Sequence, residues 1–119
     1  MVQLINSPEE KIRFYLRLAD KGILASAILV DKHNISLAQS TALKAENYVT
    51  ILSRELYASP LEPSKELINT IKTASLKHQE VLTSLLPRVS EEEKKTFETV
   101  IDFSKRNLQT IQDYQYGRN

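Results

Sequence analysis

The chain has 119 residues and a formal net charge of +1, from 16 Lys and Arg against 15 Asp and Glu. Its 41% hydrophobic and 26% charged residues are typical of a globular domain, and two glycines and four prolines are too few for a fold rich in tight turns. The mixed charge excludes a basic stripe for nucleic acid, the absence of cysteine excludes disulfides, and no apolar run approaches the roughly 20 residues that cross a bilayer.

The first predicted helix covers about residues 8–32. Ser7 is placed to cap it, Pro8 suits its first turn, and Glu10 completes a capping box. Apolar residues then recur every three or four positions, which indicates one buried helical face. They are Ile12, Leu16, Ala19, Ile23 and Val30, with Ser26 or Ala27 filling the gap. The second half of this helix, GILASAILV at 22–30, is apolar on nearly all sides.

The second predicted helix covers about residues 37–57, with Ser36 and Gln39 forming a capping box. Its apolar stripe consists of Ala38, Ala42, Ala45, Val49, Leu52 and Leu56. Because alanine is small, the first half of this stripe should allow a neighbouring helix to approach closely. Pro60 and Pro63 then end the helix.

Two further helices are predicted at about 64–86 and 91–114, the first ended by Pro87 and the second opened by a capping box of Ser90 and Glu93. Their stripes are Leu67, Ile71, Ala74, His78, Val81 and Leu85, and then Phe97, Ile101, Ser104, Leu108 and Ile111. Four amphipathic helices with short connections predict an all-α, antiparallel up-down four-helix bundle in a single domain, 1–119. A three-helix core with the first helix packed differently is the alternative.

His78 is the residue best placed for chemistry, because it falls in the core-facing register of the third stripe. It could centre a metal or small-ligand site, but the favoured interpretation is a buried histidine bonded to a tyrosine or a backbone carbonyl. Ser75 stands where a di-iron Glu-x-x-His motif needs glutamate, and His33 lies at a helix end. No phosphate loop, nucleophile elbow or zinc-protease motif occurs. We therefore expect no catalytic residue, no cofactor and no enzyme.

Leu24 and Ile28 suggest a binding surface. At about 100° per residue, they lie on the arc of the first helix that Arg13, Arg17 and Lys21 occupy earlier. Either the chain itself covers them, through the 59–63 loop or its ends, or they contact another protein. We expect a non-enzymatic interaction or assembly module that uses both residues to bind a protein partner or to form a homo-oligomer, without nucleic acid and without membrane insertion of this segment.

Three segments resemble an uncharacterised bacterial all-helical domain of unknown function. They are PEEKIRFYLRLADK (8–21), KHQEVLTSLLPRV (77–89) and EEEKKTFETVIDFSKRN (91–107). That family typically follows a signal peptide or membrane anchor, so the resemblance implies an extracytoplasmic location, in the bacterial envelope or secreted, and a non-enzymatic role. The N-terminal MVQLINSPEE itself has no signal-peptide pattern. Residues 22–26 lack the Arg-Leu-x-Glu step of the family, so no shared surface is expected there.

Overall fold

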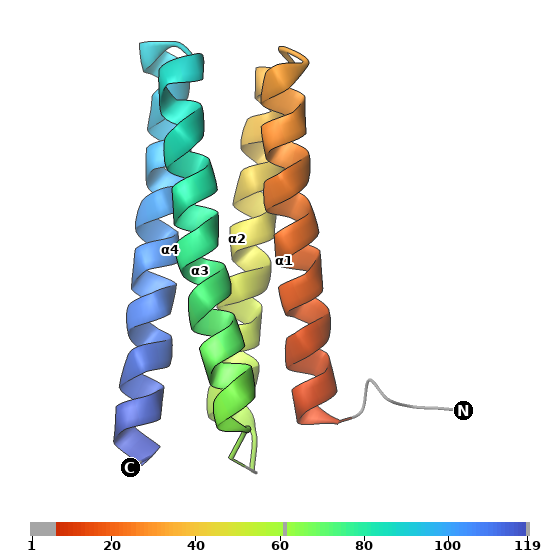
Figure 1. Ribbon diagram of the computed structural model, residues 1–119, viewed down its shortest axis with the longest axis vertical. Helices are drawn as coiled ribbons and strands as arrows, with labels where there is room; N and C mark the ends of the chain where they lie inside the picture. The colour runs from red at the N-terminus through yellow and green to blue at the C-terminus, as the bar shows by residue number, and fades with distance from the viewer. Residues whose placement is uncertain (1–6, 61, 119) are drawn as a thin grey trace, which may run out of the picture.

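Four long helices alternate in direction along the molecule (Figure 1). The computed structural model describes residues 7–60 and 62–118 and contains no strand within them. The elements are α1 (Pro8–Asp31), α2 (Ile35–Ala58), α3 (Lys65–Leu85), the short 3-10 helix η2 (Leu86–Arg88) and α4 (Glu91–Arg118). The predicted all-α, up-down four-helix bundle is confirmed. No helix of the described ranges combines the length and the apolar character that crossing a membrane requires.

Side-chain caps start three of the helices, and two of these caps, Ser7 and Ser90, are those that the sequence predicts. Ser7 Oγ accepts from the backbone N–H of Glu10 at 3.4 Å. Ser90 and Glu93 form a reciprocal capping box: Glu93 N donates to Ser90 Oγ at 3.1 Å, and Ser90 N donates to Glu93 Oε1 at 2.9 Å. Ser64 caps α3 through its hydroxyl. These bonds satisfy amide groups that have no partner inside a helix.

The capping box predicted for Ser36 and Gln39 is wrong. α2 begins before Ser36, with Asn34 at the N-cap position and no side-chain cap bond. The physical reason is the left-handed backbone of His33, whose φ of 62° turns the chain sharply enough for the helix to start earlier. Gln39 instead donates from Nε2 to the carbonyl oxygen of Glu93 at 3.3 Å and so links α2 to α4.

The other helix ends differ from the predictions by short distances. α1 ends at Asp31 and α2 ends at Ala58, one residue from each predicted end. The end of α3 tightens into η2 around Pro87. α4 continues past residue 114, because Tyr114 is buried there and packs edge-on against Tyr57 with the ring centroids 5.1 Å apart.

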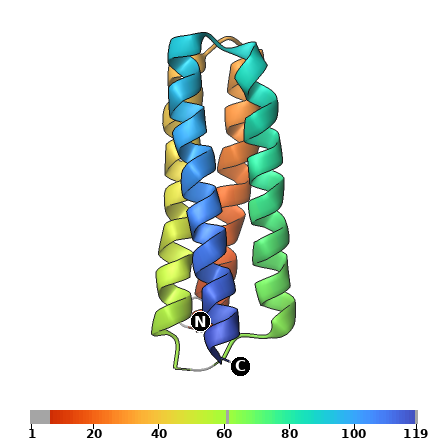
Figure 2. The same ribbon diagram turned by 90° about the vertical axis from the view of Figure 1, so that its left-hand side faces the viewer.

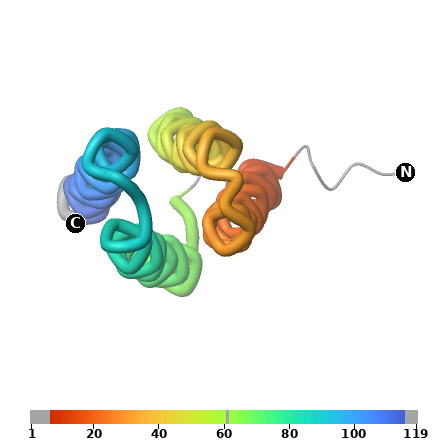
Figure 3. The backbone as a smooth tube through the Cα atoms, turned by 90° about the horizontal axis from the view of Figure 1, so that it is seen from above, coloured from red at the N-terminus to blue at the C-terminus, as the bar shows by residue number. Residues whose placement is uncertain are grey.

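The helices form two hairpins, α1–α2 and α3–α4, that lie against each other. Seen along the bundle (Figure 3), the order around it is α1, α2, α4, α3, and Figure 2 shows α4 between α2 and α3. The chain therefore passes to the opposite corner of the bundle between α2 and α3. As a result α1 lies beside α3 and α2 beside α4, each pair running in the same direction. We call these two contacts together the inter-hairpin interface.

α1 and α2 pack most closely, at a small-residue contact. A Cβ added to Gly22 would stand only 2.7 Å from Ala45 Cβ, so this glycine is required by the close approach of the two helices. Ala38 and Ala42 are completely buried in the same contact region, as the alanine stripe predicts. Ser26 fills the gap in the first stripe and donates to the carbonyl oxygen of Ala38 at 2.7 Å.

Candidate functional site

Polar side chains divide the core of the bundle into two apolar halves. The half near the start of α1 contains Ile12, Leu16, Ala19, Val49, Leu52, Leu56, Leu67, Ile68, Ile71, Ile111 and Tyr114. The other half contains Ile23, Val30, Ala38, Ala42, Ala45, Leu82, Leu85, Phe97, Val100 and Ile101. Between these two sets, along the length of the helices, the buried polar residues are Glu46, Ser75, His78 and Ser104. We call these four, with their partners Asp20 and Asn107, the polar layer.

His78 is held by an acidic residue on α1. Its side chain is buried on α3, as predicted, and its Nε2 donates to Asp20 Oδ1 at 2.6 Å. Asp20 itself is exposed, so the pair joins the core to the surface. The interpretation of His78 as a buried, hydrogen-bonded histidine is confirmed, but the partner is a carboxylate and not the tyrosine or carbonyl that we expected. The reason is that α3 lies beside α1, which brings Asp20 within hydrogen-bonding distance of His78.

Glu46 is the second ionisable group of the polar layer. The residue is 2% exposed, and its Oε2 accepts from Asn107 Nδ2 at 2.7 Å. Asn107 also donates to Thr50 Oγ1 at 3.1 Å. Burial raises the pKa of the Glu46 carboxyl from 4.5 to about 7, against the lowering effects of the Asn107 hydrogen bond and of the charge on His78. Glu46 therefore changes its charge near neutral pH.

Glu46 and His78 each have one buried side-chain atom that makes no hydrogen bond within the described residues. Within the described residues, neither Glu46 Oε1 nor His78 Nδ1 has a hydrogen-bond partner, and both atoms are buried. Each group therefore leaves one polar atom unpaired inside the core.

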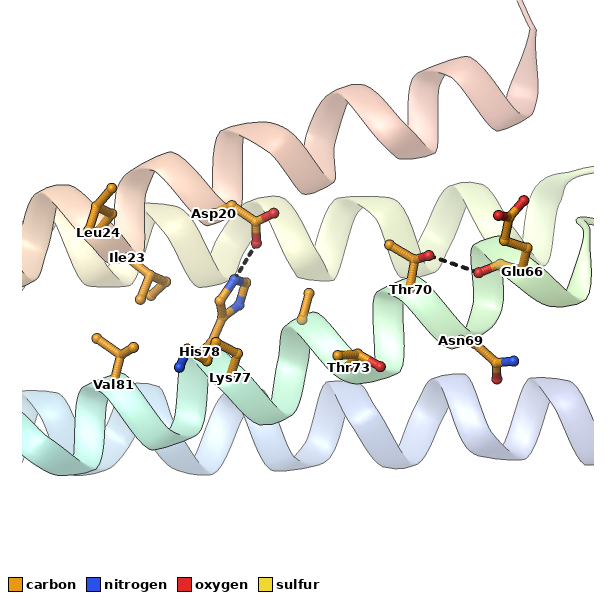
Figure 4. A pocket seen from close by; sticks show the side chains of 11 residues that line it. Asp20, Ile23, Leu24, Glu66, Asn69, Thr70, Thr73, Lys77, His78 and Val81 are labelled. Atoms are coloured by element: carbon orange, nitrogen blue, oxygen red, sulfur yellow. Dashed lines mark hydrogen bonds and ion pairs between the residues drawn. The ribbon is translucent and has the colours of Figure 1, made fainter.

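An open groove of about 800 Å³ lies between α1 and α3, with the Asp20–His78 pair in its wall (Figure 4). We call it the α1–α3 groove. It is lined by Asp20, Ile23, Leu24, Glu66, Asn69, Thr70, Thr73, Ala74, Lys77, His78 and Val81. The contact between these two helices is the smallest of the four main helix contacts. In Figure 4 the dashed Asp20–His78 bond crosses the space between α1 and α3.

Both residues predicted to bind a partner are exposed on α1. Leu24 is 63% exposed and lies at the edge of the α1–α3 groove, and Ile28 is 45% exposed one turn further along. Within the described residues, the loops of the chain leave both side chains exposed. The structure thus brings Leu24 together with His78 at one groove, while Ile28 is outside the groove lining.

The described residues offer no cluster for a metal ion. Over 7–60 and 62–118, no three His, Cys, Asp or Glu side chains are grouped so that they could hold one. His78 has one bonded carboxylate, Asp20, and its other nitrogen faces the core. The metal alternative at His78 therefore has no supporting geometry in this part of the chain.

Glu46, Asp20 and Asn107 were not identified from the sequence. A usable signal existed for Glu46, which follows Ala42 by four residues and precedes Val49 by three, and so shares the core-facing register of α2. No such signal marks Asp20, because its position in α1 is exposed.

Comparison with known proteins gives no relative: no family model, no curated protein and no solved structure matches this chain. The resemblance of its three helical segments to a bacterial domain, and the extracytoplasmic location that it implies, therefore stay predictions.

Proposed function

We propose that this chain is a non-enzymatic interaction module that binds an apolar-faced helix of a protein partner in the α1–α3 groove. The observation that carries the proposal is the groove itself, an open, largely apolar surface between two helices of a bundle. A helix laid along two neighbouring helices is a common mode of recognition.

The shape of the groove suits a helix. Its lining residues on α3 run from Glu66 to Val81, which corresponds to roughly 22 Å of helix. Apolar side chains line it from both walls: Ile23 and Leu24 from α1, and Ala74 and Val81 from α3. Large apolar residues one turn apart on a partner helix would fit between these walls.

Polar side chains line the rest of the groove. Asn69, Thr70, Thr73 and Lys77 line the groove on α3, and Asp20 does so on α1. Interfaces that form and dissociate typically have an apolar centre and a polar, hydrogen-bonding rim. This distribution favours a partner helix that is amphipathic over one that is apolar on all sides.

Leu24 and Ile28 extend this surface along α1. Leu24 belongs to the groove lining, and Ile28 lies four residues further on with 45% of its surface exposed. Together they form an apolar edge that a partner, or a second copy of the chain, covers on binding. Assembly through a second copy is the homo-oligomer form of the same proposal.

The experiment compares the Leu24→Glu, Ile28→Glu double variant with Leu76→Glu. Leu76 is 57% exposed on α3 and is outside the groove lining, so it controls for the loss of an exposed leucine. Light scattering reports the mass of each protein, and crosslinking mass spectrometry identifies any bound protein and the helix that touches α1 or α3. Complexes should form with the unsubstituted chain and with Leu76→Glu, and should be lost with the double variant. Equal complex formation by all three, with equal helical content, would contradict the proposal.

A small apolar molecule is the second candidate for the same groove. The volume of about 800 Å³ lies within the range of roughly 300–1,000 Å³ found for ligand sites, and His78 and Asp20 supply polar groups at one wall. A substitution of Ile28 distinguishes the two candidates, because Ile28 is exposed but does not line the groove. Ile28→Glu should weaken a protein complex and leave unchanged the binding of a fluorescent apolar dye such as anilinonaphthalene sulfonate.

A further inference from the structure

The outer side of α1 carries a second regular stripe of side chains, all of them exposed. Its members are Arg17, Lys21, Leu24, Ile28 and Asp31, spaced 4-3-4-3 along the helix. At about 100° per residue this spacing keeps them on one face, as in the seam of a coiled coil. Figure 3 shows α1 at a corner of the bundle, where its outer side faces away from the other helices. We call these five residues the outer stripe.

The centre of the outer stripe is apolar, and its two ends carry charges of opposite sign. Leu24 and Ile28 form the centre and are 63% and 45% exposed. The end before them is basic, with Lys21 one turn from Leu24, and the end after them is acidic, with Asp31. Asp31 pairs with Arg88 through Oδ1, and its side chain nevertheless stays 61% exposed. Along α1 the exposed surface thus changes from basic to apolar to acidic.

This order of side chains is complementary to its own reverse. Lys21 and Asp31 lie at equal distances from Ser26 along the chain, and so do Leu24 and Ile28. If a second copy of α1 lies antiparallel to the first, with a two-fold axis level with Ser26, Lys21 of each copy is level with Asp31 of the other. Leu24 of each copy is then level with Ile28 of the other. A two-fold interface requires this reciprocity, since residue i contacts j while j contacts i.

We propose that two copies of this chain dimerise through the outer stripe, with their α1 helices antiparallel about a two-fold axis level with Ser26. The charges select this orientation, because a parallel pair would place Lys21 against Lys21 and Asp31 against Asp31, and like charges in contact are unfavourable. The same axis brings the exposed Asp20 level with the exposed Lys32 of the other copy, again with opposite signs. The proposal rests on the proposed function and names its partner as a second copy.

The contact is small, so the dimer should dissociate on dilution. The outer stripe extends from Arg17 to Asp31, which is about 21 Å of helix. We expect one pair of helices over this length to bury less than the roughly 1,200–2,000 Å² that is typical of stable interfaces. The apolar centre supplies the affinity, whereas exposed ion pairs contribute more to orientation than to affinity. The dimer is therefore expected to depend on concentration.

Sedimentation equilibrium of the purified chain tests the proposal in the absence of any other protein. The mass should rise from that of one chain to that of two as the protein concentration increases. Added salt should move this transition to higher concentration, because the contacts at both ends of the stripe are exposed ion pairs. The mass of one chain at every concentration up to about 1 mM would overturn the proposal and leave the outer stripe to another occupant.

Charge substitutions test the predicted pairing. Lys21→Asp and Asp31→Lys should each raise the dissociation constant about tenfold, because the two-fold axis changes the contacts at both ends at once. An equal mixture of the two variants should dimerise again, since each then supplies the charge that the other lacks. Lys44→Asp, at an exposed site on α2, is the matched control and should have no effect. A dimer that neither single substitution weakens, or a mixture that stays monomeric, overturns the proposal.

Spin labels report the orientation even where a charge variant does not fold. Because the sequence has no cysteine, one introduced cysteine is labelled uniquely, and a dimer then contains two labels. Arg13→Cys and Lys32→Cys lie outside the outer stripe, on opposite sides of the axis. Along the helices, the two labels should be separated by about 39 Å at position 13 and by about 18 Å at position 32. Equally short distances at both positions, measured by electron paramagnetic resonance, would show parallel helices and overturn the proposal.

The dimer and the proposed function can fail separately. A purified chain that stays monomeric, but still binds a different protein through Leu24 and Ile28, overturns the dimer and supports the proposed function. A dimer that persists in the Leu24→Glu, Ile28→Glu variant contradicts both. A dimer that this variant abolishes, but whose labels show parallel helices, supports the proposed function and overturns the antiparallel pairing.

Discussion

Asn107 Nδ2 donates to Glu46 Oε2 at 2.7 Å, and this bond between α4 and α2 lies at a carboxyl group that is almost completely buried. A carboxyl in such a place is stabilised by the hydrogen bond but penalised by the loss of water when it is charged. The loss of water has the larger effect, since the pKa of Glu46 rises to about 7 despite the hydrogen bond. The stability of the bundle consequently depends on whether this group holds a proton.

Glu46→Gln should make the unfolding free energy less dependent on pH. A carboxyl whose pKa is raised on folding stabilises the fold fully below its unfolded pKa, and this contribution is lost as the pH rises through the folded pKa. For Glu46 the range runs from 4.5 to about 7, and the contribution amounts to about 3 kcal/mol. The variant should match the unsubstituted chain near the acid end and exceed its stability at pH above 7. Urea unfolding at a series of pH values measures both, and parallel curves would contradict the prediction.

Asn107→Ala should destabilise the bundle, and more so in alkaline solution. The substitution removes the side-chain donor to Glu46 Oε2, and leaving a buried acceptor without a partner costs about 1–3 kcal/mol, with more for a charged one. Because Glu46 loses its proton as the pH rises, the loss should grow between mildly acidic and alkaline conditions. Thr99→Ala, at an exposed site on the same helix, is the control. The same loss of unfolding free energy at all pH values would show that the bond does not act on the charge of Glu46.

The helices and their buried faces could be predicted from the sequence, whereas the pairs in the polar layer could not. Residues such as Ile12, Leu52 and Ile71 recur with a helical period, and all three are buried. The Asp20–His78 pair depends instead on which helices are neighbours, because Asp20 is exposed on its own helix. Short connections predict neighbours in chain order, but here the chain crosses between α2 and α3 to the opposite corner, which places α1 beside α3.

Gly22→Ala should destabilise the protein even though alanine is the better helix former. Helix propensity alone favours alanine by about 1 kcal/mol. The new Cβ, however, would stand 2.7 Å from Ala45 Cβ, and overpacking of a close helix contact costs about 1–3 kcal/mol. Thermal unfolding of Gly22→Ala, Ala45→Gly and the double variant measures the coupling of the two positions. The double variant should be more stable than the sum of the two single effects predicts, and simple additivity would show that α1 and α2 adjust without cost.

Leu16→Ala and Leu24→Ala should have very different effects on stability, although both remove the same atoms from one helix. Leu16 belongs to the buried face of α1, and truncation of such a residue leaves a cavity that costs about 2–5 kcal/mol. Leu24 is 63% exposed, so its truncation should change the unfolding free energy by less than about 0.5 kcal/mol. Urea unfolding of the two variants at low protein concentration measures the difference without a contribution from assembly. A large loss for Leu24→Ala under these conditions would mean that this side chain stabilises the bundle itself, and the reason to assign it to a partner would disappear.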